Sequence, residues 1–333
     1  MKVFDLIIIG GGPIGLCCAI EAQKAGLDYV VLEKGVLVNS LYNFPSNMTF
    51  FSTSKLLEIG GVPFISHADK PTRSESLEYF RRVAESWKLC LNLYEEVLSM
   101  ETADGQYLIH TSKDRYRSHK VIVATGFYDT PRLLNIPGEE LPKVKHFYDE
   151  VHPYVGQKVV IVGAGNSACD VALETYHKGA EVTMVVRKEQ IKPTVKYWIR
   201  PNIENRIKEG SIKAHFNSQL KEIRPHSVLI DGPEGPFELA NDFVLAMTGY
   251  KPNYDLLARL GISWTDDDKK IPAKDLESLA SNLPGVYVAG VLAGGMLTSK
   301  FFIENTRVHA QMIIRQIVEE QPAAAAGPFR GQR

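Results

Sequence analysis

The chain of 333 residues is long enough for two domains with substantial cores. Its formal net charge of −1 argues against strong steering toward nucleic acid or a membrane surface, and it has no apolar stretch as long as a transmembrane helix. Its four cysteines fit a reducing cytoplasm without a disulfide framework. We therefore expect a cytoplasmic protein with no metal site, no nucleic-acid partner and no membrane partner.

A glycine fingerprint follows the first apolar run. Residues 6–9 (LIII) predict a buried strand, and residues 10–15 (GGGPIG) predict a tight turn that opens a helix. Such a turn lets the backbone approach a pyrophosphate, and the free N–H groups of the helix bind phosphate oxygens. Glu33 ends the next predicted strand, residues 29–32, where a carboxylate can accept hydrogen bonds from ribose hydroxyls and repel a 2′-phosphate. This first unit therefore suits FAD or NAD rather than NADP.

The same pattern occurs a second time. Residues 159–162 (VVIV) precede residues 163–168 (GAGNSA), again a strand, a glycine turn and a helix. The matching second strand, residues 182–186, ends without an acid and is followed by Arg187 and Lys188. Cations at that place suit a 2′-phosphate, which favours NADPH over NADH, although an exposed basic turn is the alternative interpretation. Two dinucleotide sites in one chain suggest that electrons pass between two cofactors.

Each unit ends in a buried strand and a Thr-Gly turn, at residues 121–126 (VIVATG) and 243–249 (FVLAMTG). Segments rich in Pro and Gly follow both turns and predict hinges. We predict an α/β fold of two Rossmann-like domains in which the NADPH domain is inserted into the FAD domain. The FAD domain would comprise residues 1–130 and 250–320, the NADPH domain residues 131–249, and a disordered tail residues 321–333.

The flavin needs a positive environment near N1 and O2 when it is reduced, and a helix N-terminus supplies one. The helix expected to begin near residues 300–303 is our candidate. The loop over residues 42–50 is expected to pass close to the flavin ring, where Phe50 or Phe51 could stack; an ordinary core position is the alternative for each. The basic stretch from Lys192 to Arg200 is interpreted as a surface helix, with a position at the border of the NADPH or acceptor entrance as the alternative.

Together these features resemble the thioredoxin-reductase-like flavoproteins with two dinucleotide-binding domains, and within them the YpdA-type bacillithiol disulfide reductase family. The matching segments extend over nearly the whole chain. They are residues 47–53, 57–64, 71–73, 146–148, 152–154, 192–201 and 302–305, with Arg307 and His309. The resemblance implies bound FAD, NADPH as the electron donor and a low-molecular-weight disulfide, such as bacillithiol disulfide, as the acceptor.

Two departures concern the thiol chemistry. A thioredoxin reductase resembling this chain would carry a Cys-x-x-Cys motif before the second fingerprint, but residues 145–156 contain no cysteine. The YpdA-type family typically has Cys in the first glycine turn where this chain has Ile14, and an aliphatic side chain forms no mixed disulfide. Cys17 and Cys18 are the remaining thiol candidates near that turn, with core packing as the alternative. His309 is expected to be structural or close to phosphate rather than catalytic.

The residues expected to contact FAD or NADPH come from both turns, the strand ends, the aromatic loop and the C-terminal segment. They are Gly10, Gly12, Pro13, Ile14, Gly15, Glu33, Lys34, Phe44, Met48, Thr49, Phe50, Thr125, Gly126, Gly163, Gly165, Asn166, Ser167, Ala168, Arg187, Lys188, Gly249, Gly290, Val291, Phe302 and Ile303. We expect an NADPH-dependent flavoprotein reductase that acts as a homo-oligomer, dimer or tetramer. A ferredoxin or flavodoxin–NADP reductase, whose partner would be a small redox carrier protein, is the alternative. A flavin monooxygenase and a non-enzymatic redox sensor are further alternatives.

Overall fold

The computed structural model describes residues 2–320, which fall into two compact units. Unit 1 combines the N-terminal stretch up to Tyr42, Met48–Asp129 and the stretch from Lys251 onward, whereas unit 2 combines Asn43–Asn47 with Thr130–Tyr250. The chain therefore leaves unit 1 after Asp129 and returns to it at Lys251. The tail predicted at residues 321–333 lies outside the described residues.

Unit 1 is built on a seven-stranded sheet with β1 beside β2 and β6. The central strands are parallel, and Ile9, Leu32, Val123 and Val288 stand in register at one edge. Both faces of these strands are covered, which explains their uninterrupted apolar sequences. The strands are β1 (Val3–Ile9), β2 (Tyr29–Leu32), β3 (Leu91–Asn92), β4 (Val97–Ala103), β5 (Gln106–Thr111), β6 (Arg115–Val123) and β17 (Val286–Val288). We call the edge at which β1, β2, β6 and β17 end the carboxyl edge of unit 1.

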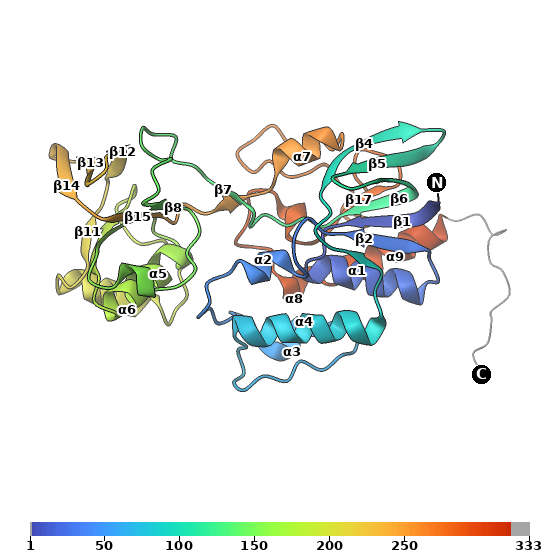
Figure 1. Ribbon diagram of the computed structural model, residues 1–333, viewed down its shortest axis with the longest axis horizontal. Helices are drawn as coiled ribbons and strands as arrows, with labels where there is room; N and C mark the ends of the chain where they lie inside the picture. Colours follow the sequence, from blue (N-terminus) through green and yellow to red (C-terminus); the bar gives the residue numbers. More distant parts are fainter. Residues whose placement is uncertain (1, 321–333) are drawn as a thin grey trace. The chain divides into compact units, whose positions relative to one another are not determined.

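Helices cover this sheet, and α1 lies beside α9 (Figure 1). The helix predicted to begin near residues 300–303 is present but interrupted, because Arg307 and Val308 separate a short α8 from α9. The helices of unit 1 are α1 (Pro13–Lys24), α2 (Asn39–Tyr42), α3 (Ser54–Leu57), α4 (Arg73–Trp87), α7 (Tyr254–Arg259), the 3₁₀ turn η2 (Gly290–Gly294), α8 (Ile303–Thr306) and α9 (His309–Glu319).

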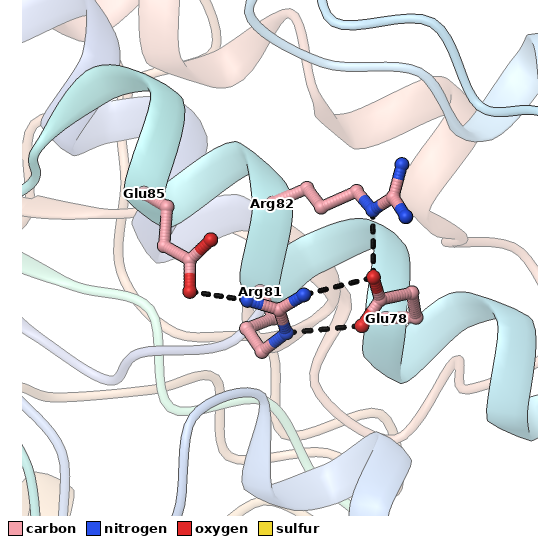
Figure 2. Close-up of polar contacts among 4 residues, drawn as sticks. All are labelled: Glu78, Arg81, Arg82 and Glu85. Carbon is pink, nitrogen blue, oxygen red and sulfur yellow. Dashed lines mark hydrogen bonds and ion pairs between the residues drawn. The ribbon is translucent and has the colours of Figure 1, made fainter.

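The exposed face of α4 carries a network of ion pairs (Figure 2). Glu78 Oε1 lies 2.8 Å from Arg81 Nη2 and 2.6 Å from Arg82 Nε, and Arg81 also pairs with Glu85. These hydrogen bonds lower the pKa of the Glu78 carboxyl to about 2. The pairs follow the spacing of three and four residues that brings side chains together on a helix, while Phe80 is fully buried. Charge therefore marks the solvent side of α4.

Unit 2 contains a five-stranded parallel sheet in the order β11-β10-β9-β15-β8, with α5 following β9, and a separate antiparallel sheet of three strands. The parallel strands are β8 (Val144–Lys145), β9 (Lys158–Val162), β10 (Glu181–Val185), β11 (Lys213–His215) and β15 (Phe243–Ala246). The antiparallel strands are β12 (Gln219–Ile223), β13 (Ser227–Gly232) and β14 (Gly235–Ala240). The remaining elements are η1 (His152–Tyr154), α5 (Asn166–His177), α6 (Arg200–Lys208) and the paired short strands β7 (Thr130–Pro131) and β16 (Tyr250–Lys251).

The prediction of a basic surface helix from Lys192 to Arg200 is wrong. The stretch up to Ile199 forms turns and loops, and α6 begins only at Arg200. The segment is held instead by backbone contacts with the second glycine turn, described below. Within residues 2–320, no helix combines the length and the apolar character needed to cross a membrane.

Candidate functional site

The first glycine turn lies at the carboxyl edge of unit 1, between β1 and α1. Gly10 has a φ of +108°, and a Cβ there would lie 2.7 Å from the Ala124 carbonyl oxygen. A Cβ on Gly15 would lie 1.8 Å from the Gly10 carbonyl oxygen. A Cβ on Gly12, in contrast, would meet no atom within 4 Å. The first and last glycines therefore close the turn, and Gly12 keeps open the space in front of the N-terminus of α1, as a bound pyrophosphate requires.

Glu33 lies directly after β2, beside this turn. Its buried carboxylate accepts hydrogen bonds from Gly11 N at 2.7 Å and Gly35 N at 2.9 Å. Burial raises the pKa of Glu33, and the two backbone N–H groups offset part of the increase. A carboxylate offers about four lone-pair sites, so oxygen acceptors remain for ribose hydroxyls. Lys34, which was also predicted to contact the cofactor, pairs with Asp129 across 2.8 Å.

The second turn repeats these features in unit 2. Gly163 has a φ of +136°, and a Cβ there would lie 2.5 Å from the Met247 carbonyl oxygen. A Cβ on Gly165 would have only the Lys192 side chain, at 4.0 Å, as a neighbour. Ala168 is fully buried beneath the turn, as the third small residue of the fingerprint should be. The turn therefore has the same open middle glycine as the first one, and it fits a second dinucleotide.

The loop from Lys192 to Lys196, which the sequence favours as part of a surface helix, is fastened to this second turn. Lys192 N donates to the Ala164 carbonyl oxygen at 3.0 Å, and Lys196 N donates to Asn166 Oδ1 at 2.9 Å. The Lys196 ammonium pairs with Asp170 on α5 at 3.1 Å. Two lysines thus lie next to the glycine turn through backbone contacts. Their basic composition and the family resemblance of residues 192–201 were the sequence signals, and neither distinguished these lysines from surface residues.

Arg187 and Lys188 follow β10 and are exposed. In the stretch from residue 2 to residue 320, neither side chain forms an ion pair. No acid occupies the place that Glu33 has in unit 1, because Val186 is the residue that follows the strand there. Two exposed cations at this end of β10 are suited to a 2′-phosphate group, and that contact stays a prediction.

The C-terminal segment of unit 1 completes the carboxyl edge. Gly290 opens η2 with a φ of +73°, and its vacant Cβ position lies 3.2 Å from the Ile14 side chain. The vacant Cβ position of Gly126 lies 3.8 Å from Val291 Cγ2. The structure therefore brings the predicted residues of the first turn, the Thr-Gly turn and η2 together. His309 joins them, since its Nδ1 accepts a hydrogen bond from Gly290 N at 3.1 Å.

The aromatic residues predicted to lie near the flavin differ in burial and in the unit to which they belong. Phe50 is buried, whereas Phe51 is 51% exposed and stacks on Phe302 with ring centroids 6.4 Å apart. Thr49 forms a β-bridge with Thr72, which anchors the loop that begins at Met48. Phe44 belongs to the short segment that groups with unit 2, although it was expected in the FAD domain.

Three of the cysteines are inaccessible. Cys17, Cys18 and Cys169 are buried, and burial raises the pKa of Cys17 and of Cys169 to about 12 and raises that of Cys18 well above its ordinary value. A protonated thiol in a packed core is a poor nucleophile. The burial of Cys17 and Cys18 favours the packing interpretation over a redox role. Among the described residues, no group of three or more His, Cys, Asp or Glu side chains could hold a metal ion.

Two Rossmann units, each with an open glycine turn at its carboxyl edge, define a dinucleotide-dependent oxidoreductase. The sequence pattern of one family, described as pyridine nucleotide-disulphide oxidoreductase, matches residues 7–290. The chain belongs to the pyridine nucleotide-disulphide oxidoreductase family.

Individual relatives agree with this assignment. The chain is 40% identical to the bacilliredoxin reductase Bdr of Bacillus subtilis, over 95% of this chain and 98% of that protein. The crystal structure of the bacillithiol disulfide reductase Bdr (YpdA) from Bacillus cereus superposes with a TM-score of 0.94 and 38% identity, over 96% of this chain and all of that one. A ferredoxin–NADP reductase of Ignicoccus hospitalis is 26% identical over 86% of this chain and 89% of its own length. The predicted family, fold class and reductase class are confirmed.

Proposed function

We propose that this protein is a reductase that carries reducing equivalents from NADPH through FAD to a low-molecular-weight disulfide, with bacillithiol disulfide as the first candidate. The observation that carries the proposal is the likeness to bacillithiol disulfide reductases, at 38–40% identity over nearly the whole chain. FAD and NADPH are the cofactors, and when bound they supply hydride transfer from the nicotinamide to the flavin. The net reaction converts NADPH, a proton and one disulfide into NADP⁺ and two thiols.

We assign FAD to unit 1 and NADPH to unit 2. Glu33 supports the first assignment, because a buried carboxylate beside the turn accepts hydrogen bonds from ribose hydroxyls and repels a 2′-phosphate. Arg187 and Lys188 support the second, because they are exposed cations at the corresponding place. The chain's own residues would thus select each cofactor by the charge at one strand end, while the open Gly12 and Gly165 admit the pyrophosphates.

The absence of a cysteine at position 14 distinguishes this chain from the YpdA-type family. Ile14 packs against Gly290 where the YpdA-type family has a cysteine, and the other thiols near the turn are buried. If bacillithiol disulfide is the acceptor, it is reduced without a mixed disulfide to residue 14. The test is anaerobic NADPH oxidation by the purified holoenzyme with bacillithiol disulfide as sole acceptor. Turnover well above the rate without acceptor supports the proposal.

If wild type shows no turnover, an Ile14→Cys variant distinguishes a site that lacks only the thiol from a site that does not accept the disulfide. Ile14→Val is the size control. Cysteine is smaller than isoleucine, so it fits the space against Gly290. Activity only in Ile14→Cys would mean that the site accepts the disulfide but that this chain uses another substrate. Inactivity of all three proteins, with the flavin still bleached by NADPH, would refute the disulfide proposal.

A ferredoxin or flavodoxin–NADP reductase is the second candidate. The aliphatic contact between Ile14 and Gly290 favours it, because one-electron carriers need no protein thiol. Reduction of a ferredoxin or flavodoxin at a rate above that with bacillithiol disulfide would establish it.

We also propose that the protein acts in the cytoplasm as a homo-oligomer. Exposed apolar side chains such as Ile65, which is 89% exposed, support an interface, and light scattering of the purified protein tests it.

A further inference from the structure

Where η2 meets α1, Gly290 has no side chain of its own, so its backbone packs against the side chain of Ile14. Gly290 is buried, and its vacant Cβ position is 3.2 Å from Ile14 Cβ and Cγ1 and 3.3 Å from Ile14 Cγ2. Ala289 N donates to the Val123 carbonyl oxygen at 2.9 Å, which continues the pairing of β17 with β6 up to this point. The Gly290 backbone therefore packs on Ile14 in the first turn of α1, the helix that begins directly after the open position at Gly12.

On the side away from α1, the His309 side chain accepts a hydrogen bond from the backbone of Gly290. The side chain stands at the start of α9, is 8% exposed, and accepts the Gly290 N–H at Nδ1 across 3.1 Å. Because Nδ1 accepts, the proton of the neutral ring is on Nε2. Burial, and secondarily Lys274, lowers the pKa of His309 to about 4, so the ring is neutral at physiological pH. The side chain is thus a permanent acceptor under the conditions in which the protein works.

We propose that His309 is a positioning residue for the FAD site: by accepting the Gly290 N–H, it holds η2 against the first turn of α1 and so sets how tightly FAD is bound. A residue without an acceptor would leave a buried N–H unpaired, and the η2 turn would move to find a partner. Any such movement changes the contact with Ile14, and with it the donors that face the pyrophosphate. The inference rests on the assignment of FAD to unit 1 and does not depend on which electron acceptor the enzyme uses.

The experiment compares variants that differ in where they place an acceptor. In His309→Asn the side-chain oxygen lies close to the position of Nδ1, whereas in His309→Gln it lies close to that of Nε2. His309→Leu has no acceptor, and His119→Leu removes an exposed histidine of the same unit as a control. FAD release from each holoenzyme is followed by the rise in flavin fluorescence after dilution, and flavin circular dichroism reports the ring environment. Binding of 2′,5′-ADP to unit 2 checks that the rest of the protein is intact.

We expect FAD dissociation constants within about threefold of wild type for His309→Asn and His119→Leu, and at least tenfold weaker binding for His309→Gln and His309→Leu, with 2′,5′-ADP binding unchanged in all. Equal FAD affinity in His309→Gln and wild type would overturn the proposal, and so would equal weakening in His309→Asn and His309→Gln. If His309→Leu fails to fold, the comparison of Asn with Gln decides alone. No disulfide is present in these assays. Their results therefore do not depend on whether bacillithiol disulfide is the electron acceptor.

Discussion

Gly12 and Gly165 offer a reciprocal test of the two dinucleotide sites. Both have negative φ angles, −74° and −93°, and neither position has an atom within about 4 Å of an added Cβ except Lys192 Cδ. Alanine therefore enters either turn without a clash, and we expect each substitution to change the free energy of unfolding by less than about 1 kcal/mol. The added methyl group projects into the space that a pyrophosphate needs.

The size of the effect follows from the bonds that the methyl group would displace. Loss of one hydrogen bond between a backbone N–H and a charged phosphate oxygen costs about 1.5–3 kcal/mol, or about 10- to 100-fold in affinity. Gly165→Ala should raise the KM for NADPH by that factor and leave the FAD content unchanged. Gly12→Ala should weaken FAD binding by the same factor and leave 2′,5′-ADP binding unchanged.

Steady-state kinetics with saturating FAD, flavin fluorescence and thermal melts together measure these quantities. Wild-type affinity for both cofactors in both variants would refute our interpretation of the open glycines. A variant that weakens both cofactors equally would refute the assignment of one dinucleotide to each unit. Gly15→Ala serves as the contrast, because its Cβ would lie 1.8 Å from the Gly10 carbonyl oxygen, so that variant should lose stability rather than affinity alone.

Further predictions concern charge and packing. Arg187→Ala should raise the KM for NADPH at least tenfold more than the KM for NADH, and equal changes would contradict a 2′-phosphate contact. Because the pKa of His309 is lowered from 6.5 to about 4, its contribution to stability is complete above about pH 6.5 and is lost as the pH falls toward 4. Urea unfolding at pH 7 and pH 5 should show a loss of about 2 kcal/mol in wild type beyond that in His309→Asn. Asp129→Asn removes the partner of Lys34, and we expect FAD release to depend less on salt than in wild type; an unchanged salt dependence would exclude a role for this pair. Phe80→Ala should cost about 3–5 kcal/mol of unfolding free energy, since Phe80 is fully buried, and a loss under 1 kcal/mol would contradict the packing of α4.

Local patterns were sufficient for the central elements of the fold. The runs before Gly10 and Gly163 are apolar on both faces because both sheets are covered, and this is visible in the sequence without any long-range information. The glycine spacing identified the turns because each closing position leaves no room for a Cβ, as the 1.8 Å approach at Gly15 illustrates. The basic residues after β10 could also be located from the sequence, because they lie at a fixed number of residues from the second glycine turn.

What the sequence did not reveal depends on contacts between distant segments. Lys192 is joined to the second turn by a backbone hydrogen bond to Ala164, which no side-chain pattern reports. His309 was noted only as structural or close to phosphate, because its partner is the N–H of Gly290 and not another side chain. Lys34 was predicted to contact the cofactor from its place after Glu33, whereas its ion pair requires Asp129 from the turn between β6 and β7.

The burial of the cysteines bears on how the enzyme withstands oxidative stress. Low-molecular-weight disulfides accumulate when oxidants are abundant, and those oxidants attack accessible thiolates most readily. Cys17, Cys18 and Cys169 are shielded and protonated, and even the exposed Cys90 has a raised pKa, mainly because it is partly desolvated. A reductase built in this way offers peroxide almost no reactive thiol of its own, so it should keep working when enzymes with a catalytic dithiol are being inactivated.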